Sequence, residues 1–271
     1  MSKKIRADQA VVQQGLLDDV EVAKRSIMAG EVFTTKEIRI MTPGQQIKPD
    51  EALYIKNKHL KYVSRGGYKL EKGLESFEVD PTDKIAIDIG SSTGGFTDAF
   101  LQAGAKKVYA VDVGTNQLVW RLRNDPNVIV MEQTNFRYVT PDDLKEGIPE
   151  IASIDVSFIS LKLILPTLSQ VLKRGGDVIA LIKPQFEAHR EDVPTGGIVT
   201  DRSVHKNVLE NILTFASKTF DVKALTTSPI KGSGGNVEFL THLVLPETDR
   251  ETSVSETIDI DALLDSIEES K

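Results

Sequence analysis

The first residues of the chain carry apolar side chains at the spacing of a helix. Residues 4–16 place small apolar residues three and four positions apart, and Gly15 ends the pattern. Val20–Met28 repeats this spacing, with Asp18 or Asp19 available as its N-cap. The sequence therefore predicts two short amphipathic helices at the start of the chain.

A more extended pattern follows these helices. Short β-prone runs lie at residues 31–34, 37–40 and 52–55, with turns at residues 42–44 and 48–50. Two helices followed by such a strand-and-turn unit predict a small α+β domain over residues 1–60. Residues 56–61 are basic and hydrophilic, which favours a linker between domains.

The next stretch, residues 64–77, predicts one longer helix. Leu70, Leu74 and Phe77 fall on one face of it, so this face is expected to pack inward. Lys69 lies beside the apolar stripe rather than on it, and can therefore border a cleft.

From Lys84 onward, apolar runs of strand length alternate with helical patterns. Strands are predicted at residues 85–89, 107–112, 128–131, 151–156, 177–182, 222–228 and 238–245, and helices at 97–103, 116–123, 161–174 and 199–220. This alternation predicts a parallel, doubly wound sheet with right-handed crossovers. The last link, residues 231–236, is too short for a crossover and predicts an antiparallel hairpin. The fold class is therefore α/β, with a Rossmann-like seven-stranded sheet over residues 61–246.

Charge is distributed unevenly along this chain, whose formal net charge is −7. Residues 247–271 hold nine acidic and two basic residues, whereas residues 1–72 hold fourteen basic and nine acidic ones. A basic first part joined to a larger body is typical of nucleic-acid binding. The acidic tail is expected to be flexible or weakly docked, although apolar residues from Ile258 to Ile267 allow one short helix.

Composition excludes several kinds of site. The chain has no cysteine, and its four histidines show no metal-ligand spacing, so neither disulfides nor a metal site are predicted. The basic first residues precede no apolar core of a signal peptide. The longest apolar run, Val178–Ile182, is far too short to span a bilayer. We therefore expect a cytoplasmic protein that does not act on membranes.

A glycine-rich turn between a strand and a helix is the strongest local signal. The sequence from Asp88 to Asp98 reads Asp-Ile-Gly-Ser-Ser-Thr-Gly-Gly-Phe-Thr-Asp. Such a turn lets backbone N–H groups and a helix N-terminus approach a ligand. It lacks the spacing of the phosphate-binding glycine motifs, and the acidic strand end suits a ligand with a cationic end. These features favour an S-adenosylmethionine site over a nucleotide phosphate site.

Polar residues at the ends of neighbouring strands extend this predicted cofactor site. Asp88 ends the first strand and can face the methionine amino group, while Asp112 ends the second and suits ribose hydroxyls. Asn135 follows the third strand and can lie beside the adenine.

Charged residues occupy two further strand ends. Asp155 ends the fourth strand, and Lys183 ends a strongly apolar strand just before Pro184. A lysine in that place is costly to bury without a partner. Glu238 begins the last strand and adds a further charged candidate.

Three resemblances follow from these residues. Lys69, Asp155, Lys183 and Glu238 have the order and strand placement of the Lys-Asp-Lys-Glu tetrad of FtsJ-type ribose 2′-O-methyltransferases. Residues 1–60 resemble the RNA-binding module of ribosomal protein S-four, through Arg6-x-Asp8-x-Ala10, Ala23-Lys-Arg25, Met28-Ala-Gly-Glu-Val32 and the two proline turns. From about Lys4 to Pro246 the chain resembles the hemolysin A (TlyA) family of ribosomal RNA methyltransferases.

The resemblance implies roles for named residues. It implies methyl transfer from S-adenosylmethionine to the ribose 2′-hydroxyl of a cytidine. The cytidine would belong to ribosomal RNA, either free or within a ribosomal subunit. The four charged residues are the implied catalytic set. The implied cofactor-binding residues are Asp88, Gly90, Ser91, Ser92, Gly94, Gly95, Phe96, Asp112 and Asn135, and the implied RNA-binding residues are Arg6, Lys24, Arg25 and Arg65.

Lys183 is the central candidate of the tetrad, and two roles are open for it. A ribose hydroxyl is a poor nucleophile, so a base or a stabilising charge assists its attack. Two nearby carboxylates favour the charged lysine, whereas a second lysine and burial favour the neutral one. Lys183 is therefore either a general base or a cation that orients the 2′-oxygen.

Three other functions are compatible with parts of the pattern. A ribosome-associated RNA-binding factor could keep the cofactor fold without catalysis, although the intact tetrad argues against it. A membrane-lytic protein, as the hemolysin name suggests, would need an amphipathic or membrane-spanning stretch that the sequence does not show. A dinucleotide oxidoreductase would share the strand-turn-helix pattern, but its glycine residues would have a different spacing.

Overall fold

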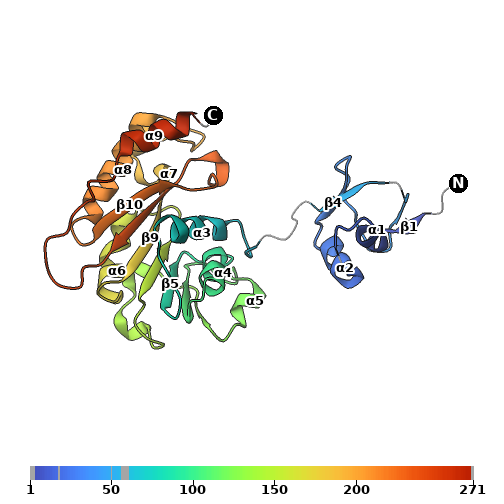
Figure 1. Cartoon of the computed structure of the whole chain (residues 1–271), viewed down its shortest axis with the longest axis horizontal. Helices are drawn as coiled ribbons and strands as arrows, with labels where there is room; N and C mark the ends of the chain where they lie inside the picture. The colour runs from blue at the N-terminus through green and yellow to red at the C-terminus, as the bar shows by residue number, and fades with distance from the viewer. Residues whose placement is uncertain (1–3, 18, 50, 56–60, 270–271) are drawn as a thin grey trace. The chain divides into compact units, whose positions relative to one another are not determined.

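The computed structural model describes residues 4–17, 19–49, 51–55 and 61–269, which belong to two compact units. The first unit comprises residues 1–60 and the second residues 61–271. Figure 1 shows both units, each with its own helices and strands. Residues 56–60 of the predicted linker over 56–61 and the alternative cap Asp18 lie outside the described residues.

The first unit packs two helices against two small antiparallel ribbons. Its elements are β1 (Ile5–Arg6), α1 (Ala7–Gln13), α2 (Val20–Met28), β2 (Val32–Thr34), β3 (Gln46–Ile47) and β4 (Leu53–Ile55). Strand β1 pairs with β3, and β2 pairs with β4. Asp19 caps α2 by accepting hydrogen bonds from the backbone N–H groups of Glu21 and Val22. The expected helix over 4–16 starts only at Ala7, because Ile5 and Arg6 are held in the β1–β3 ribbon.

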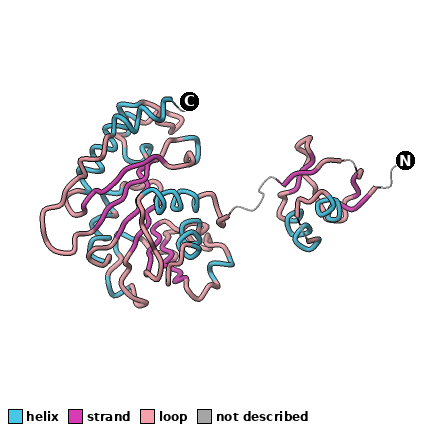
Figure 2. Tube along the Cα trace, in the orientation of Figure 1, coloured by secondary structure: helices cyan, strands magenta, loops and turns pink. Residues whose placement is uncertain are grey.

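The second unit is built around one seven-stranded sheet (Figure 2). Its strands are β5 (Ile85–Ile89), β6 (Lys107–Val111), β7 (Val128–Met131), β8 (Ile151–Ile154), β9 (Asp177–Ile182), β10 (Asp221–Thr227) and β11 (Phe239–Val244). The strand order is β10-β11-β9-β8-β5-β6-β7, and β11 is antiparallel to both of its neighbours. The predicted Rossmann-like sheet with a reversed last strand is therefore confirmed. Strands β5, β6 and β7 follow one another toward one edge of the sheet, and β8 and β9 follow toward the other edge. Ligands bind in such folds at the point where this order changes, which here lies between the parallel strands β5 and β8.

Helices cover both faces of this sheet because its central strands, such as β8 and β9, carry buried apolar side chains on both faces. The helices are α3 (Gly66–Ser76), α4 (Gly95–Gln102), α5 (Trp120–Arg123), α6 (Leu165–Val171), α7 (Pro184–Glu187), α8 (Arg202–Ala216) and α9 (Ile260–Glu269). Helices α3 and α4 share one core with Ile179 and Leu181 of β9. Helices α6 and α8 share the other core with Ile182 of the same strand.

Several helices are shorter than their apolar patterns predict. The expected helix over 116–123 is reduced to α5, because Asn116 has a φ of 54° and the Glu132 carboxylate accepts the backbone N–H groups before the helix. The expected helix over 161–174 is divided into a 3₁₀ turn, Leu161–Leu163, and α6, which begins next to Pro166. The expected helix over 199–220 begins later, where the Asp201 side chain caps α8.

The acidic tail is docked, which corrects the expectation of a flexible segment. Leu264 of α9 is only 2% exposed and belongs to the core that α8 covers. Asp261 forms ion pairs with Arg202 and Lys206, and Asp265 pairs with Arg202. Figure 1 shows α9 lying along α8. Buried apolar side chains and opposite charges on α8 together stabilise a segment whose composition alone suggests disorder.

We predict that Leu264→Ala lowers the free energy of unfolding by about 2–5 kcal/mol, the usual cost of truncating a buried leucine. Leu263→Ala is the matched control, since Leu263 is only partly buried on the same helix. Denaturant unfolding measures both. Equal small effects of the two substitutions would contradict the docked position of α9.

Candidate active site

Two adjoining cavities open at the carboxyl ends of the central strands. The charged cavity has a volume of about 420 Å³ and is lined by Lys69, Asp155, Lys183 and Glu238 together with Ser64, Arg65, Gly66, Gly90, Ser91, Ser92, Thr93, Gly95, Phe96, Ser157, Ile230, Lys231 and Gly232. The strand-end cavity has a volume of about 340 Å³ and is lined by Ile89, Val111, Asp112, Val113, Gln117, Thr134, Asn135, Phe136, Val156, Phe158, Ile159 and Ile164, besides Gly90, Ser92, Asp155 and Ser157. The last four residues line both cavities, so the two spaces share one wall.

The glycine turn after β5 forms part of this shared wall. Gly90 has a φ of +88°, and a Cβ atom there would lie 2.4 Å from the backbone oxygen of Asp155. Gly94 has a φ of +99°, and a Cβ atom there would lie 2.4 Å from Leu122. Only glycine fits both positions, because side chains are excluded by the backbone conformation and by the neighbouring atoms. The backbone of the turn therefore lies directly against the cavities. Helix α4 begins at Gly95, at the end of this turn.

Asp88 lies beneath the turn rather than in either cavity. Its carboxylate is fully buried and accepts hydrogen bonds from the hydroxyl groups of Thr97, at 2.7 Å, and Ser153, at 3.1 Å. Burial raises the pKa of Asp88 to about 7, against the opposing effect of these two hydrogen bonds. In this structure Asp88 therefore joins α4 to β8 and does not line the space expected for a cofactor.

The other predicted cofactor residues border the cavities, except Gly94, which lies against the side chains of Leu118 and Leu122. Asp112 lies at the end of β6, and its carboxylate accepts the backbone N–H groups of Ser92 and Gly114. Asn135 follows β7 and accepts the backbone N–H group of Arg137. Both line the strand-end cavity beside the apolar side chains of Val113 and Phe136. An apolar wall with a few fixed polar groups is the usual form of a cofactor site.

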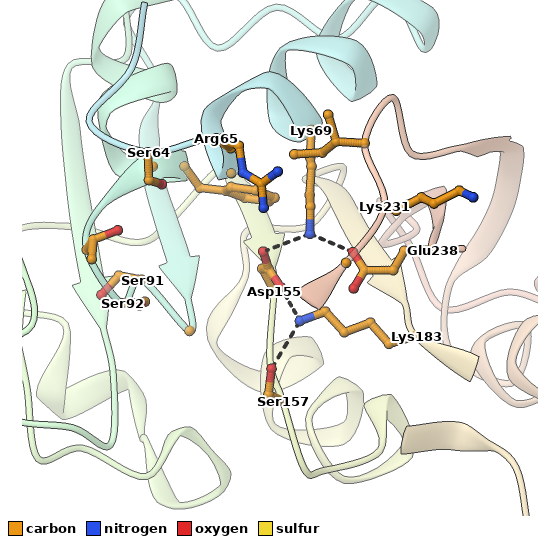
Figure 3. Close-up of a pocket in the computed structure, with 17 residues that line it drawn as sticks. Ser64, Arg65, Lys69, Ser91, Ser92, Asp155, Ser157, Lys183, Lys231 and Glu238 are labelled. Carbon is orange, nitrogen blue, oxygen red and sulfur yellow. Dashed lines mark hydrogen bonds and ion pairs between the residues drawn. The ribbon is translucent and has the colours of Figure 1, made fainter. Parts of the chain in front are cut away.

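The four charged residues meet in one cluster, drawn in Figure 3. The Nζ atom of Lys69 lies 2.5 Å from Oε2 of Glu238 and 3.8 Å from Oδ2 of Asp155. The Nζ atom of Lys183 lies 2.5 Å from Oδ1 of Asp155. The two lysines thus approach Asp155 from different sides and share it.

Burial makes this cluster unusual among the ion pairs of the protein. The side chains of Lys69 and Lys183 are each 9% exposed, Asp155 is 19% exposed and Glu238 is 3% exposed. Removing a charge from water is costly unless an opposite charge is in contact with it. Two lysines and two carboxylates balance one another here, so each charge keeps a partner while the cluster still borders an open cavity.

Four separate elements supply these four side chains. Lys69 lies on α3, Asp155 follows β8, Lys183 follows β9, and Glu238 precedes β11. Strands β8, β9 and β11 are neighbours in the sheet, so their ends meet at one place. Pro184 ends the strand after Lys183 and begins α7, a short helix absent from the predicted elements.

A glycine loop holds the Glu238 side of the cluster. A Cβ atom at Gly232 would lie 2.1 Å from Oε1 of Glu238, so only glycine allows the loop to pass so close. Asn236 is 3% exposed, donates to the backbone oxygen of Gly197 and accepts the backbone N–H group of Val199. These bonds tie the loop to residues 197–199 and thereby restrain Glu238.

Sequence reasoning missed other residues of the two cavities. The hydroxyl group of Ser157 accepts a hydrogen bond of 3.2 Å from Lys183. Lys231 borders the charged cavity, and the ring of Phe158 is 90% exposed beside the strand-end cavity. Ser157 and Phe158 are close in sequence to Asp155, and Lys231 begins the glycine link, so proximity to predicted residues was the available signal.

The residues predicted to bind RNA fall in both units. Arg65 is exposed at the rim of the charged cavity. In the first unit Arg6 forms an ion pair with Asp8, Lys24 pairs with Glu21, and Arg25 is exposed on α2. Arg6 and Lys24 are therefore partly neutralised by neighbouring carboxylates.

Asp88 predicts a pH dependence of stability. Its pKa is about 7 in the folded chain and near 3.8 in an unfolded one. Because the folded state holds the proton more tightly, the contribution of Asp88 to stability is complete below pH 4 and is lost as the pH rises through 7. Asp88→Asn is expected to remove this loss, so that the variant gains about 2–4 kcal/mol relative to the wild type between pH 4 and 8.

Denaturant unfolding at pH 4, 5, 6, 7 and 8 measures this gain. Asp142→Asn, which replaces an exposed carboxylate, serves as the control. Parallel stability curves for the wild type and Asp88→Asn across this range would show that Asp88 is ionised without a penalty in the folded protein.

Residues 62–245 match the family of FtsJ-like methyltransferases. The Bacillus subtilis protein YqxC, provisionally named an rRNA methyltransferase, is 56% identical over 246 residues, which cover 90% of this chain and 87% of that protein. The 16S/23S rRNA (cytidine-2′-O)-methyltransferase TlyA of Mycobacterium tuberculosis is 36% identical over 258 residues, covering 93% of this chain and 94% of TlyA.

A solved structure agrees with these relatives. A Streptococcus thermophilus protein provisionally named a hemolysin is 50% identical, with a TM-score of 0.76 over 99% of this chain and 97% of that one. The family match over residues 62–245 spans the glycine turn, the positions of the four charged residues and the seven-stranded sheet. The chain belongs to the FtsJ-like methyltransferase family, among relatives that carry the TlyA and hemolysin names.

Proposed function

We propose that this chain transfers a methyl group from S-adenosylmethionine to the 2′-hydroxyl of a cytidine ribose in ribosomal RNA. The observation that carries the proposal is the buried cluster of Lys69, Asp155, Lys183 and Glu238 in a cavity that shares a wall with the glycine-turn site. The relatives with assigned activity are named rRNA (cytidine-2′-O)-methyltransferases, and this naming supports both the base and the position on the ribose.

The residues around the strand-end cavity fit S-adenosylmethionine. Asp112 offers carboxylate oxygens to ribose hydroxyls, and Asn135 offers an amide beside the apolar wall that suits an adenine. Gly90, Ser91 and Ser92 would bring backbone against the methionine part. When bound, S-adenosylmethionine supplies an electrophilic methyl group.

The charged cavity fits the hydroxyl that accepts this group. A ribose hydroxyl must lose its proton as its oxygen attacks, so the reaction is assisted by a base that takes the proton or by a cation that stabilises the negative charge developing on the oxygen. The ammonium or amine of Lys183 borders the cavity and is held by Asp155 and Ser157. Lys183 can therefore orient the 2′-oxygen and either accept its proton or stabilise its developing charge.

The other two charged residues fix the position of Lys183. Lys69 contacts both Glu238 and Asp155, so the four side chains form one continuous chain of charge. Asp155 would otherwise be free to turn toward solvent, because it is the most exposed of the four. We assign Lys69 and Glu238 the role of holding Asp155, and with it Lys183, in the orientation that the reaction requires.

The first unit supports RNA as the substrate. Its two helices and two small ribbons, with Arg25 exposed on α2, fit the module expected to bind RNA. Arg25, and Arg65 at the rim of the charged cavity, would contact phosphates of the RNA. A ribosomal RNA substrate, free or within a ribosomal subunit, would also place the chain in the cytoplasm, as the sequence predicts.

Several relatives carry the name hemolysin. No helix within the described residues is both long and apolar enough to cross a bilayer. A non-catalytic RNA-binding factor remains the alternative that the lysine cluster argues against most directly, because such a protein has no use for two buried lysines beside a cofactor site.

We predict that Lys183→Ala lowers the rate of methyl transfer to ribosomal RNA by roughly 10²–10⁴-fold, the usual contribution of a positioned acid or base. Binding of S-adenosylmethionine, measured by calorimetry, should be retained, since Lys183 does not line the strand-end cavity. Radiolabelled methyl transfer gives the rate. Lys145→Ala, an exposed lysine at the opposite end of the sheet, should behave as the wild type.

Lys183→Arg separates the two possible roles of this lysine. Arginine keeps the positive charge but does not release a proton near neutral pH. If Lys183 is an orienting cation, the arginine variant should keep much more activity than the alanine variant, whereas a general base would leave both inactive. Undiminished transfer by a folded Lys183→Ala protein would overturn the assignment.

A further inference from the structure

Trp120 is the most exposed residue of α5, and nothing in the proposed reaction uses it. Its side chain is 77% exposed, while Leu118 and Leu122 on either side of it are 4% and 1% exposed. These two leucines pack beneath Gly94 of the glycine turn. The backbone around Trp120 is thus held firmly while its indole ring faces solvent.

The position of Trp120 links it to the charged cavity. The backbone N–H group of the preceding residue, Val119, donates to the backbone oxygen of Thr93, which lines that cavity. The next residue, Arg121, donates from Nη2 to the buried carboxylate of Asp98 at 2.8 Å. Trp120 therefore lies beside the rim of the cavity.

Asp98 connects the same place to the start of the second unit. Its carboxylate also accepts the backbone N–H group of Val63 at 2.8 Å, and Ser64, the next residue, lines the charged cavity. Gln102, one turn further along α4, donates to the backbone oxygen of Lys61. Arg121 thus lies beside Val63, which directly precedes the cavity-lining Ser64.

The chemistry of this rim suits RNA. Unpaired nucleobases stack on exposed aromatic rings and on the planes of arginine side chains, and nearby cations contact the phosphates. The side chain of Arg121 is 64% exposed although one of its nitrogens binds Asp98, and the side chain of Lys61 is 54% exposed although its Nζ atom pairs with Glu71. Because Asp98 is buried and paired with Arg121, its charge does not oppose a phosphate at this surface.

We infer that Trp120 stacks on an unpaired base of the RNA that flanks the methylated nucleotide, with Arg121 beside the adjoining phosphate. This inference rests on the proposed function, because it needs RNA to enter the charged cavity. It adds a base-binding position at a side chain that lines neither cavity.

Trp120 is the only tryptophan of the chain, so its fluorescence reports directly on this position. The full-length protein is titrated with in vitro transcribed 16S and 23S ribosomal RNA, and bound RNA is measured in parallel by filter retention. The free protein should show the emission of a solvent-exposed indole, and binding should quench it. Bound RNA with unchanged emission would overturn the inference, as would an indole already shielded in the free protein by another part of the chain.

Substitution provides a second, kinetic test on ribosomal subunits. Trp120→Leu should raise KM for the subunits about 5- to 100-fold while kcat and S-adenosylmethionine binding change little, as expected for the loss of one stacked base. Trp120→Phe should restore most of the affinity. Ile148→Ala truncates another exposed apolar side chain, 61% exposed, at the other end of the sheet and should leave KM unchanged.

The two tests separate this inference from the proposed function. An unchanged KM for Trp120→Leu in an active enzyme removes the stacking role and leaves the methyltransferase assignment intact. If the wild type transfers no methyl group to ribosomal RNA, the proposed function fails, and RNA-dependent quenching then decides the stacking role by itself. A higher KM for both Trp120→Leu and Trp120→Phe, with loss of thermal stability, would indicate a structural role for the residue and overturn the inference.

Discussion

The contact between Lys183 and Asp155 is the interaction on which the site depends. Each charge is largely withdrawn from water and is stabilised by the other, and Lys69 with Glu238 extends the pair into a balanced group of four. No two of these residues are neighbours in sequence. They meet because β8, β9 and β11 lie side by side in the sheet and because α3 packs over the same edge. The sheet order, with its reversed last strand, is therefore a requirement of the chemistry.

The glycine turn imposes a second constraint, which connects the two cavities. Gly90 packs against the backbone of Asp155, whose carboxylate is shared by the two lysines. The same residue therefore contacts both the lysine cluster and the turn that would hold the cofactor. Asp88 supports the turn from below through Thr97 and Ser153 at the cost of an unfavourable burial of its own carboxylate. Donor and acceptor sites are thus positioned by the same few atoms, and displacement of one would disturb the other.

Much of the architecture follows from local sequence pattern, and the exceptions have physical causes. The seven strands and their alternation with helices can be predicted from the sequence, because apolar runs and glycine turns mark them. Charged residues at the strand ends indicate the cluster. The docking of α9 cannot be predicted from local sequence, because it depends on ion pairs with Arg202 and Lys206, which are distant in sequence. The shortening of α5 depends on Glu132 in the same way. The burial of Asp88 was missed because a strand-end acid was expected to face the ligand.

The central claim is that the lysine cluster directs methyl transfer to a cytidine 2′-oxygen of ribosomal RNA. Mass mapping of nuclease-digested ribosomal RNA tests it most directly, with RNA from cells that contain the protein, lack it, or contain only Lys183→Ala. The account predicts a cytidine that carries one methyl group on its ribose in the first sample and none in the other two. Identical methylation in all three samples would contradict it.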